Sequence, residues 1–138
     1  MKLCFQRFSY ILFLSFLCLS CSSLSSFDQT TIDQANSLKT MALSLMDNAT
    51  NPYSDLTPQI DDLRKKLDEA YQYSKSRNNN EETTKQWEVL IKPDGNLLGG
   101  FLSRWKSQGQ LGQSFVIQAK DLVGNAFDEI VQLENSKK

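Results

Sequence analysis

The 138-residue sequence contains no histidine. Histidine is the commonest general base, a frequent metal ligand and the usual partner of serine and cysteine nucleophiles. Its absence excludes every active site built on an imidazole, including the Glu-x-x-His motif of di-iron helical bundles. No other grouping of nucleophile, base and orienting residue stands out, so we expect a protein that is not an enzyme and uses no cofactor.

Cysteine is scarce and confined to one place. Cys4, Cys18 and Cys21 all lie within the first 21 residues. The rest of the chain therefore has no disulfide, no thiolate metal site and no cysteine nucleophile. Its fold is indifferent to the redox state of its compartment.

The sequence also lacks an excess of basic residues. Of its 15 basic and 16 acidic residues, residues 1–20 contain Lys2 and Arg7 and no acid, which leaves 13 basic and 16 acidic residues, a net charge of −3, in the remainder. A nucleic-acid-binding protein needs a concentrated basic face, so the partner is not nucleic acid. This charge also gives no attraction to an anionic lipid surface, and any membrane attachment must have another source.

The longest apolar run of the sequence is too short to be a comfortable membrane span. Residues 9–19, "SYILFLSFLCL", follow Lys2 and Arg7 and are followed at once by small polar residues. Eleven helical residues extend about 16 Å, roughly half the thickness of the hydrocarbon core of a bilayer. A basic start, a short apolar stretch and small residues are the order of a secretory signal peptide.

The end of this run, Leu17-Cys18-Leu19-Ser20-Cys21, resembles the lipobox of bacterial lipoproteins. The resemblance implies that a signal peptidase recognises Leu19 and Ser20, cuts before Cys21, and leaves Cys21 as the first residue with acyl chains on its thiol. Cys18 stands where the family most often has leucine. Ser22, in place of aspartate, resembles the lipoproteins sent to the outer membrane, which implies its periplasmic face if the source is Gram-negative.

Two alternatives to lipidation stay open. One is an ordinary cleaved signal peptide, and the other is an uncleaved anchor, because residues 8–27 carry no charge. Under the lipoprotein interpretation, residues 1–20 are the signal peptide, residues 21–29 are the lipidated cysteine with a flexible tether of about 16 Å, and residues 30–138 are the folded domain. Two or three acyl chains would hold such a protein permanently in its leaflet.

From residue 30 onward, apolar residues recur every three to four positions, which predicts helices. The first helix begins with Thr30 or Thr31 as N-cap, and the second with Thr57 as N-cap and Pro58 in the first helical position. The polar tail "ENSKK" is expected to fray. With no strand-like alternation, the fold class is all-α, a small antiparallel bundle of four to five helices. The predicted spans end near residues 49, 76, 91, 108 and 135. The two short helices, third and fourth, form the remaining crossover or a fourth arm.

Pairs of acidic residues invite a metal or acid–base site, but adjacent helix positions point about 100° apart and cannot converge on one ion. Helix starts explain Asp61/Asp62 and Glu81/Glu82, and a solvated face explains Asp128/Glu129. The segment "DNATNPYSD" has part of the oxygen spacing of a calcium loop but lacks its glycine and closing glutamate. No metal site is predicted.

The stretch "LLGGFLSRWKSQGQLG", residues 97–112, is the most unusual part of the body. Two adjacent glycines near a helix start cost about 2 kcal/mol relative to alanine, so we expect a close approach that only glycine allows. One interpretation is a partner surface, and the favoured one is a core stripe packed against the last helix. The candidate surface residues are Phe101, Arg104, Trp105 and Lys106.

These features together predict a membrane-anchored helical lipoprotein of the bacterial envelope that acts by binding, as a scaffold, adaptor or inhibitor. Its partners would be the membrane, through the lipid on Cys21, and an envelope protein. The alternative is a carrier with an apolar ligand inside the bundle. A pocket of several hundred Å³ between the helices would favour the carrier, whereas a tightly packed core would favour the binding protein.

Overall fold

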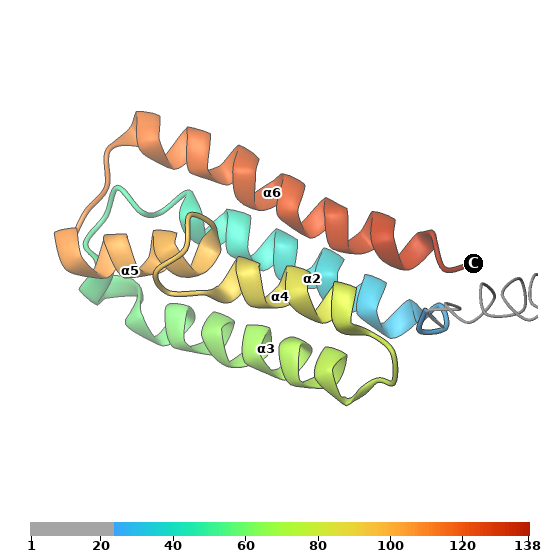
Figure 1. The fold of residues 1–138 in the computed structure, drawn as a ribbon. Helices are drawn as coiled ribbons and strands as arrows, with labels where there is room; N and C mark the ends of the chain where they lie inside the picture. Colours follow the sequence, from blue (N-terminus) through green and yellow to red (C-terminus); the bar gives the residue numbers. More distant parts are fainter. Residues whose placement is uncertain (1–23) are drawn as a thin grey trace, which may run out of the picture.

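The computed structural model describes residues 24–138, and these form five α-helices and one 3₁₀ turn (Figure 1). This confirms the predicted all-α bundle, and the described residues contain no strand. The elements are α2 (Gln29–Met46), η1 (Tyr53–Leu56), α3 (Thr57–Ser76), α4 (Glu81–Ile91), α5 (Leu98–Gln108) and α6 (Gln113–Asn135).

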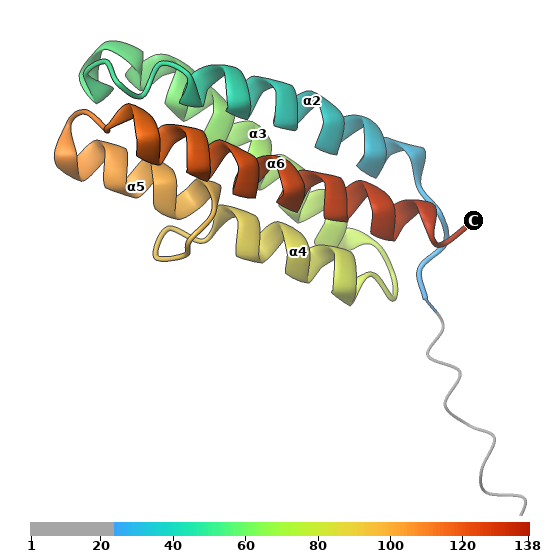
Figure 2. The same cartoon turned by 90° about the horizontal axis from the view of Figure 1, so that it is seen from above.

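Three long helices and one divided arm make up the bundle. Helices α2, α3 and α6 have 18, 20 and 23 residues, whereas α4 and α5 have 11 each and follow one another along the fourth side (Figure 2). Helix α2 packs against α3 and α6, and α4 packs against the same two helices from the other side. The start of α2 and the C-terminus lie at one end of the bundle, and α5 lies at the other (Figure 1).

The predicted apolar positions fill the centre. The four-and-three spacing of α3 puts Ile60, Leu63 and Leu67 on the buried face. Burying such a side chain contributes about 1.5–3 kcal/mol. In α6 the predicted stripe fails at Leu122, which is 55% exposed. The side chains with no exposed surface include Trp87, Leu90, Leu98, Trp105, Phe127 and Ile130.

Both predicted threonine caps are wrong. The N-cap of α2 is Asp28, whose Oδ2 accepts hydrogen bonds from the Thr31 backbone N–H at 2.8 Å and from the Thr31 hydroxyl at 2.7 Å. At α3, the Thr57 hydroxyl donates back to the carbonyls of Tyr53 and Ser54, at 3.3 and 3.2 Å. The 3₁₀ turn before α3 offers these carbonyls, so Thr57 is already helical and Pro58 is the second residue of the helix, not the first.

The glycine pair marks the close approach that the sequence predicts. A Cβ on Gly99 would lie 2.2 Å from the carbonyl oxygen of Ile91, and a Cβ on Gly100 would lie 1.7 Å from that of Gly95. Both are far below van der Waals contact, so the turn between α4 and α5 folds directly onto the first turn of α5. Gly109, with φ of 78°, ends α5 where the sequence predicts.

The frayed C-terminal tail is a second wrong prediction. Helix α6 continues to Asn135, Glu134 has no exposed surface, and the side chain of Lys137 is only 3% exposed. From the sequence alone, charged residues at the end of a chain are expected to be exposed to solvent. Here they are covered by the residues that lead into α2.

Candidate functional site

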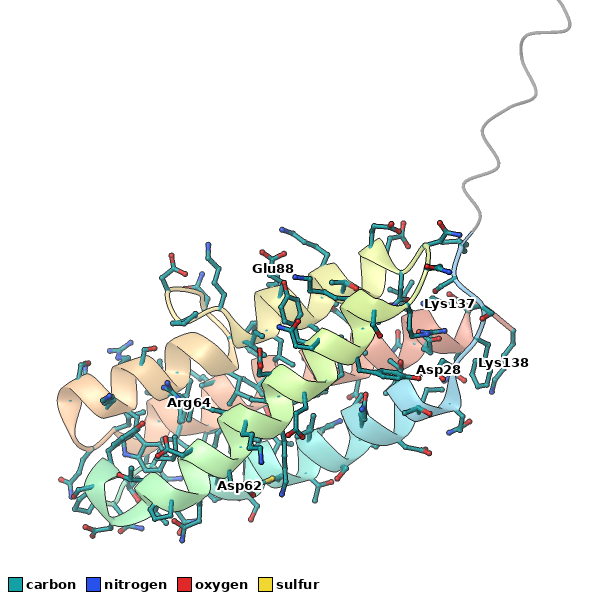
Figure 3. The ribbon with its side chains drawn as sticks, turned by 90° about the horizontal axis from the view of Figure 1, so that it is seen from below. Asp28, Asp62, Arg64, Glu88, Lys137 and Lys138 are labelled. Carbon is teal, nitrogen blue, oxygen red and sulfur yellow. The ribbon has the colours of Figure 1, made fainter. Side chains whose placement is uncertain are left out.

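The first candidate site is a cluster of buried polar side chains at the end of the bundle where the chain enters α2. Its centre is Lys137, whose Nζ lies 2.8 Å from Ser25 Oγ, Asn80 Oδ1, Thr83 Oγ1 and Glu134 Oε2. Figure 3 shows Lys137 at this end, on the same side as Asp28. We use the name polar cluster for this set of side chains: Ser25, Asp28, Arg77, Asn80, Thr83, Glu134 and Lys137.

Two cations in the polar cluster share one carboxylate. Arg77 Nη1 donates to Glu134 Oε1 at 3.2 Å, and Lys137 binds the other oxygen. Burying an ion pair requires full compensation by partners, and removing one partner leaves an uncompensated charge that costs about 3–5 kcal/mol. Every formal charge here has such a partner, so the loss of any one of them would destabilise the packing of α3, α4 and α6 at this end.

The polar cluster also holds the N-terminal segment, residues 24–28. The Ser25 backbone N–H donates to the Asn79 carbonyl at 2.9 Å, and Arg77 donates to the Ser26 carbonyl. Lys138 Nζ lies 4.5 Å from the ring centroid of Phe27. The flexible tether predicted for residues 21–29 is therefore wrong for residues 25–28, which are bound to the bundle.

Asp28 joins the N-terminal segment to the helices electrostatically. Burial acts to raise the pKa of its carboxyl, but hydrogen bonds from Thr31 and Tyr73 and the charge of Arg77 outweigh burial, so the pKa lies below its ordinary value. The Tyr73 hydroxyl donates to Asp28 Oδ2 at 3.1 Å. The ionised form of Asp28 is therefore the form that stabilises the fold.

The lipidation residues lie outside the described part of the chain. Leu19, Ser20 and Cys21 precede residue 24, so their roles stay predictions. Within residues 24–138, no helix combines the length and the apolar character needed to cross a bilayer.

The predicted partner surface divides between core and surface. Phe101 is 3% exposed and Trp105 not at all, and the Trp105 indole N–H donates to the Asn51 carbonyl at 3.1 Å. The favoured core interpretation is confirmed for these two residues, and a partner surface that exposes them is wrong. Arg104 and Lys106 are exposed, and they line two different hollows.

Arg104 lies in the second candidate site, a groove between α5 and α6 with a volume of about 280 Å³. The guanidinium carbon of Arg104 stands 4.3 Å from the ring centroid of Phe115, and Phe115 stacks on Phe101 at 5.9 Å with an interplanar angle of 6°. The α5–α6 groove is lined by Gly95, Asn96, Gly100, Phe101, Arg104, Phe115, Gln118, Ala119 and Leu122.

Lys106 borders a wider groove of about 800 Å³ at the same end of the bundle. Tyr53, Asp61 and Gln110 are among the other residues that line it. Its lining is mainly polar and carries both charge signs, so it has no preference for a ligand of one charge.

The acidic pairs do not form a site. Glu81 and Glu82 are exposed in the first turn of α4. The first turn of α3 contains no acid, so the predicted helix-start explanation is wrong for Asp61 and Asp62, which are exposed one turn further along α3. Asp128 pairs with Lys39 at 2.7 Å. In residues 24–138, no three histidine, cysteine or acidic side chains lie close enough together to hold a metal ion.

Comparisons of the chain with models of protein families, with curated proteins and with solved structures gave no match. The two candidate sites therefore rest on their own geometry. The sequence reveals neither site directly. A usable signal for the polar cluster is that Arg77, Asn80 and Glu134 fall at helix ends, which an antiparallel bundle brings to one end.

Proposed function

We propose that the protein is a lipid-anchored helical lipoprotein of the bacterial envelope that acts by binding another envelope protein. The observation that carries this proposal is the opposite placement of the two candidate sites. The polar cluster fixes the N-terminal segment at one end of the bundle, and the α5–α6 groove is lined by residues of α5, the helix at the other end (Figure 2), and of α6.

The chain length upstream supports a defined anchored end. Only three residues lie between Cys21 and the bound Ser25, and the four residue steps reach at most about 14 Å. A lipid on Cys21 would therefore hold the polar-cluster end of the bundle near the headgroups. Helix α6, with 23 residues, is about 35 Å long, so the other end can stand well clear of the lipid.

The packing of the bundle favours a binding protein over a carrier. Trp87, Trp105 and Phe127 lie along the axis with no exposed surface. Side chains of this size fill the space in which a carrier would hold an apolar ligand. The α5–α6 groove, by contrast, opens on the surface, where a protein partner can reach it.

Metabolic labelling with a fatty-acid probe in a bacterial host tests the anchor. We expect the wild-type chain to be labelled and Cys21→Ser to lose the label. Cys18→Ser is the matched control, because it removes the neighbouring thiol and should keep the label. Equal labelling of Cys21→Ser and wild type would overturn the proposal.

A further inference from the structure

We propose that the α5–α6 groove binds a segment of a partner protein that presents a carboxylate beside a large apolar side chain. This inference rests on the proposed function for its setting and adds the chemistry of the partner. It is argued from the charge, the lining and the position of the groove.

Arg104 is a cation without an acidic partner. Each salt bridge in residues 24–138 joins other side chains, and the contact of the Arg104 guanidinium is with the Phe115 ring at 4.3 Å. A guanidinium that rests on an aromatic face keeps its N–H groups along the edge free for two parallel hydrogen bonds to a carboxylate. Arg104 is thus already oriented for an acidic group of a ligand.

The groove around Arg104 combines apolar and polar side chains and contains no acid. Its lining includes Phe101, Phe115, Ala119 and Leu122, and none of its residues is aspartate or glutamate. Leu122 is 55% exposed and lines the groove together with Gly95 and Asn96, which belong to the turn between α4 and α5. An exposed leucine beside stacked aromatic rings provides a contact for an apolar side chain.

The size of the groove fits side chains better than a whole small molecule. Its volume of about 280 Å³ lies just below the range for ligand pockets, which starts at about 300 Å³. That space suits one or two side chains of a peptide. The amides of Asn96 and Gln118 at the lining can bond the peptide backbone.

The position of the groove favours a protein over the membrane as the source of the ligand. Helix α5 lies at the end of the bundle opposite to the N-terminal segment (Figure 1). An anchor upstream of residue 24 holds the opposite end at the lipid, so the groove faces partners outside the membrane.

The test is selection from a phage-displayed library of random heptapeptides against the full lipidated protein in phosphatidylethanolamine nanodiscs, with empty nanodiscs for counter-selection. We expect the enriched peptides to carry aspartate or glutamate next to leucine, isoleucine, methionine or phenylalanine. Enrichment of peptides without an acid, or no enrichment, would overturn the proposal.

Variants then locate the binding of an enriched peptide, followed by fluorescence anisotropy. We expect Arg104→Gln to raise its Kd about tenfold or more, and Leu122→Ser to weaken it as well. Lys106→Gln is the matched control, an exposed cation two residues further along α5 that lies outside the groove. Equal affinity of wild type and Arg104→Gln would place binding elsewhere and overturn the proposal.

The fatty-acid label on the same preparation separates the two proposals. A labelled protein that selects no acidic peptide contradicts the groove alone. An unlabelled protein that still binds the peptide through Arg104 contradicts the anchor alone. Circular dichroism of Arg104→Gln verifies that a loss of binding is not a loss of folding.

Discussion

The two ends of the bundle use arginine in opposite ways. At the polar-cluster end, Arg77 is 14% exposed and is neutralised by Glu134 inside the fold. At the other end, Arg104 is exposed and rests on Phe115, with no acid beside it. A buried, fully paired cation serves the fold, whereas a cation oriented on a ring and left unpaired is available to a partner. Four predictions test this difference, in order of decreasing effect on stability.

The largest effect is expected at Glu134. Glu134→Gln removes the charge that Arg77 and Lys137 share. It leaves the buried Lys137 without an acidic partner and Arg77 with only the longer contact to Asp28 at 3.9 Å. We expect the free energy of unfolding in urea to fall by about 3–5 kcal/mol. Glu129→Gln, at an exposed position of the same helix, should change it by less than about 0.5 kcal/mol. A small effect at Glu134 would mean that the polar cluster does not fasten this end.

The next effect is expected at Gly100, at the opposite end. Gly100→Ala places a Cβ 1.7 Å from the Gly95 carbonyl oxygen, so the turn must move, and we expect a loss of about 1–3 kcal/mol in a urea titration. Gly124→Ala is the control, because its Cβ meets only Lys39 and Leu43 side-chain atoms at 3.7 and 3.8 Å. Within helix α6 that alanine should stabilise by up to about 1 kcal/mol. Equal signs for the two variants would contradict the close approach.

Asp28 should give a smaller, pH-dependent effect. The folded state lowers the pKa of Asp28, so its contribution is present above the unfolded pKa of about 3.9 and is lost as the pH falls through the lower folded value. We expect Asp28→Asn to cost about 1 kcal/mol at pH 7, and the difference from wild type to shrink below about pH 4. Urea unfolding at pH 7 and pH 3 measures it. A difference that grows on acidification would contradict the assignment.

The smallest effect on stability is expected at Arg104. Arg104→Gln removes an exposed cation–π contact, which is worth about 0.5–1 kcal/mol. Arg77→Gln should cost several times more, because it leaves part of the Glu134 charge uncompensated. Thermal unfolding of the two variants side by side measures the contrast. Similar losses would show that both arginines are structural and remove the distinction between the two ends.

Much of the fold was predictable because it depends on local pattern. Helical periodicity gave the five helices, Gly109 marked the end of α5, and the pair Gly99 and Gly100 signalled a close approach. The caps were missed because Asp28 competes with Thr31 for the same helix end, and a short acid at the boundary satisfies both the backbone N–H and the threonine hydroxyl. The spacing of residues in the sequence does not show whether Asp28 or a threonine caps the helix.

The sites depend on contacts between distant residues, and these were not predictable. Lys137 meets Ser25 across 112 positions of sequence, so a polar tail and a polar tether each look solvated until the fold brings them together. Leu122 follows the helical spacing of apolar residues in α6, yet it is 55% exposed, which the spacing does not indicate. The sequence grouped Phe101, Arg104, Trp105 and Lys106 as one possible partner surface. It did not separate the buried Phe101 and Trp105 from the exposed Arg104 and Lys106.

The hydrogen bonds of Ser25 to the helix ends determine how the molecule responds to a pulling force. A pull on the chain from the N-terminal side reaches the hydrogen bonds of Ser25 and Ser26 to the ends of α3, α4 and α6 before it reaches the first turn of α2. Several contacts then share the force at once, and α2 is not peeled from the bundle one turn at a time. Substitutions at Lys137 would lower the force at which the N-terminal segment detaches, a quantity that single-molecule pulling measures.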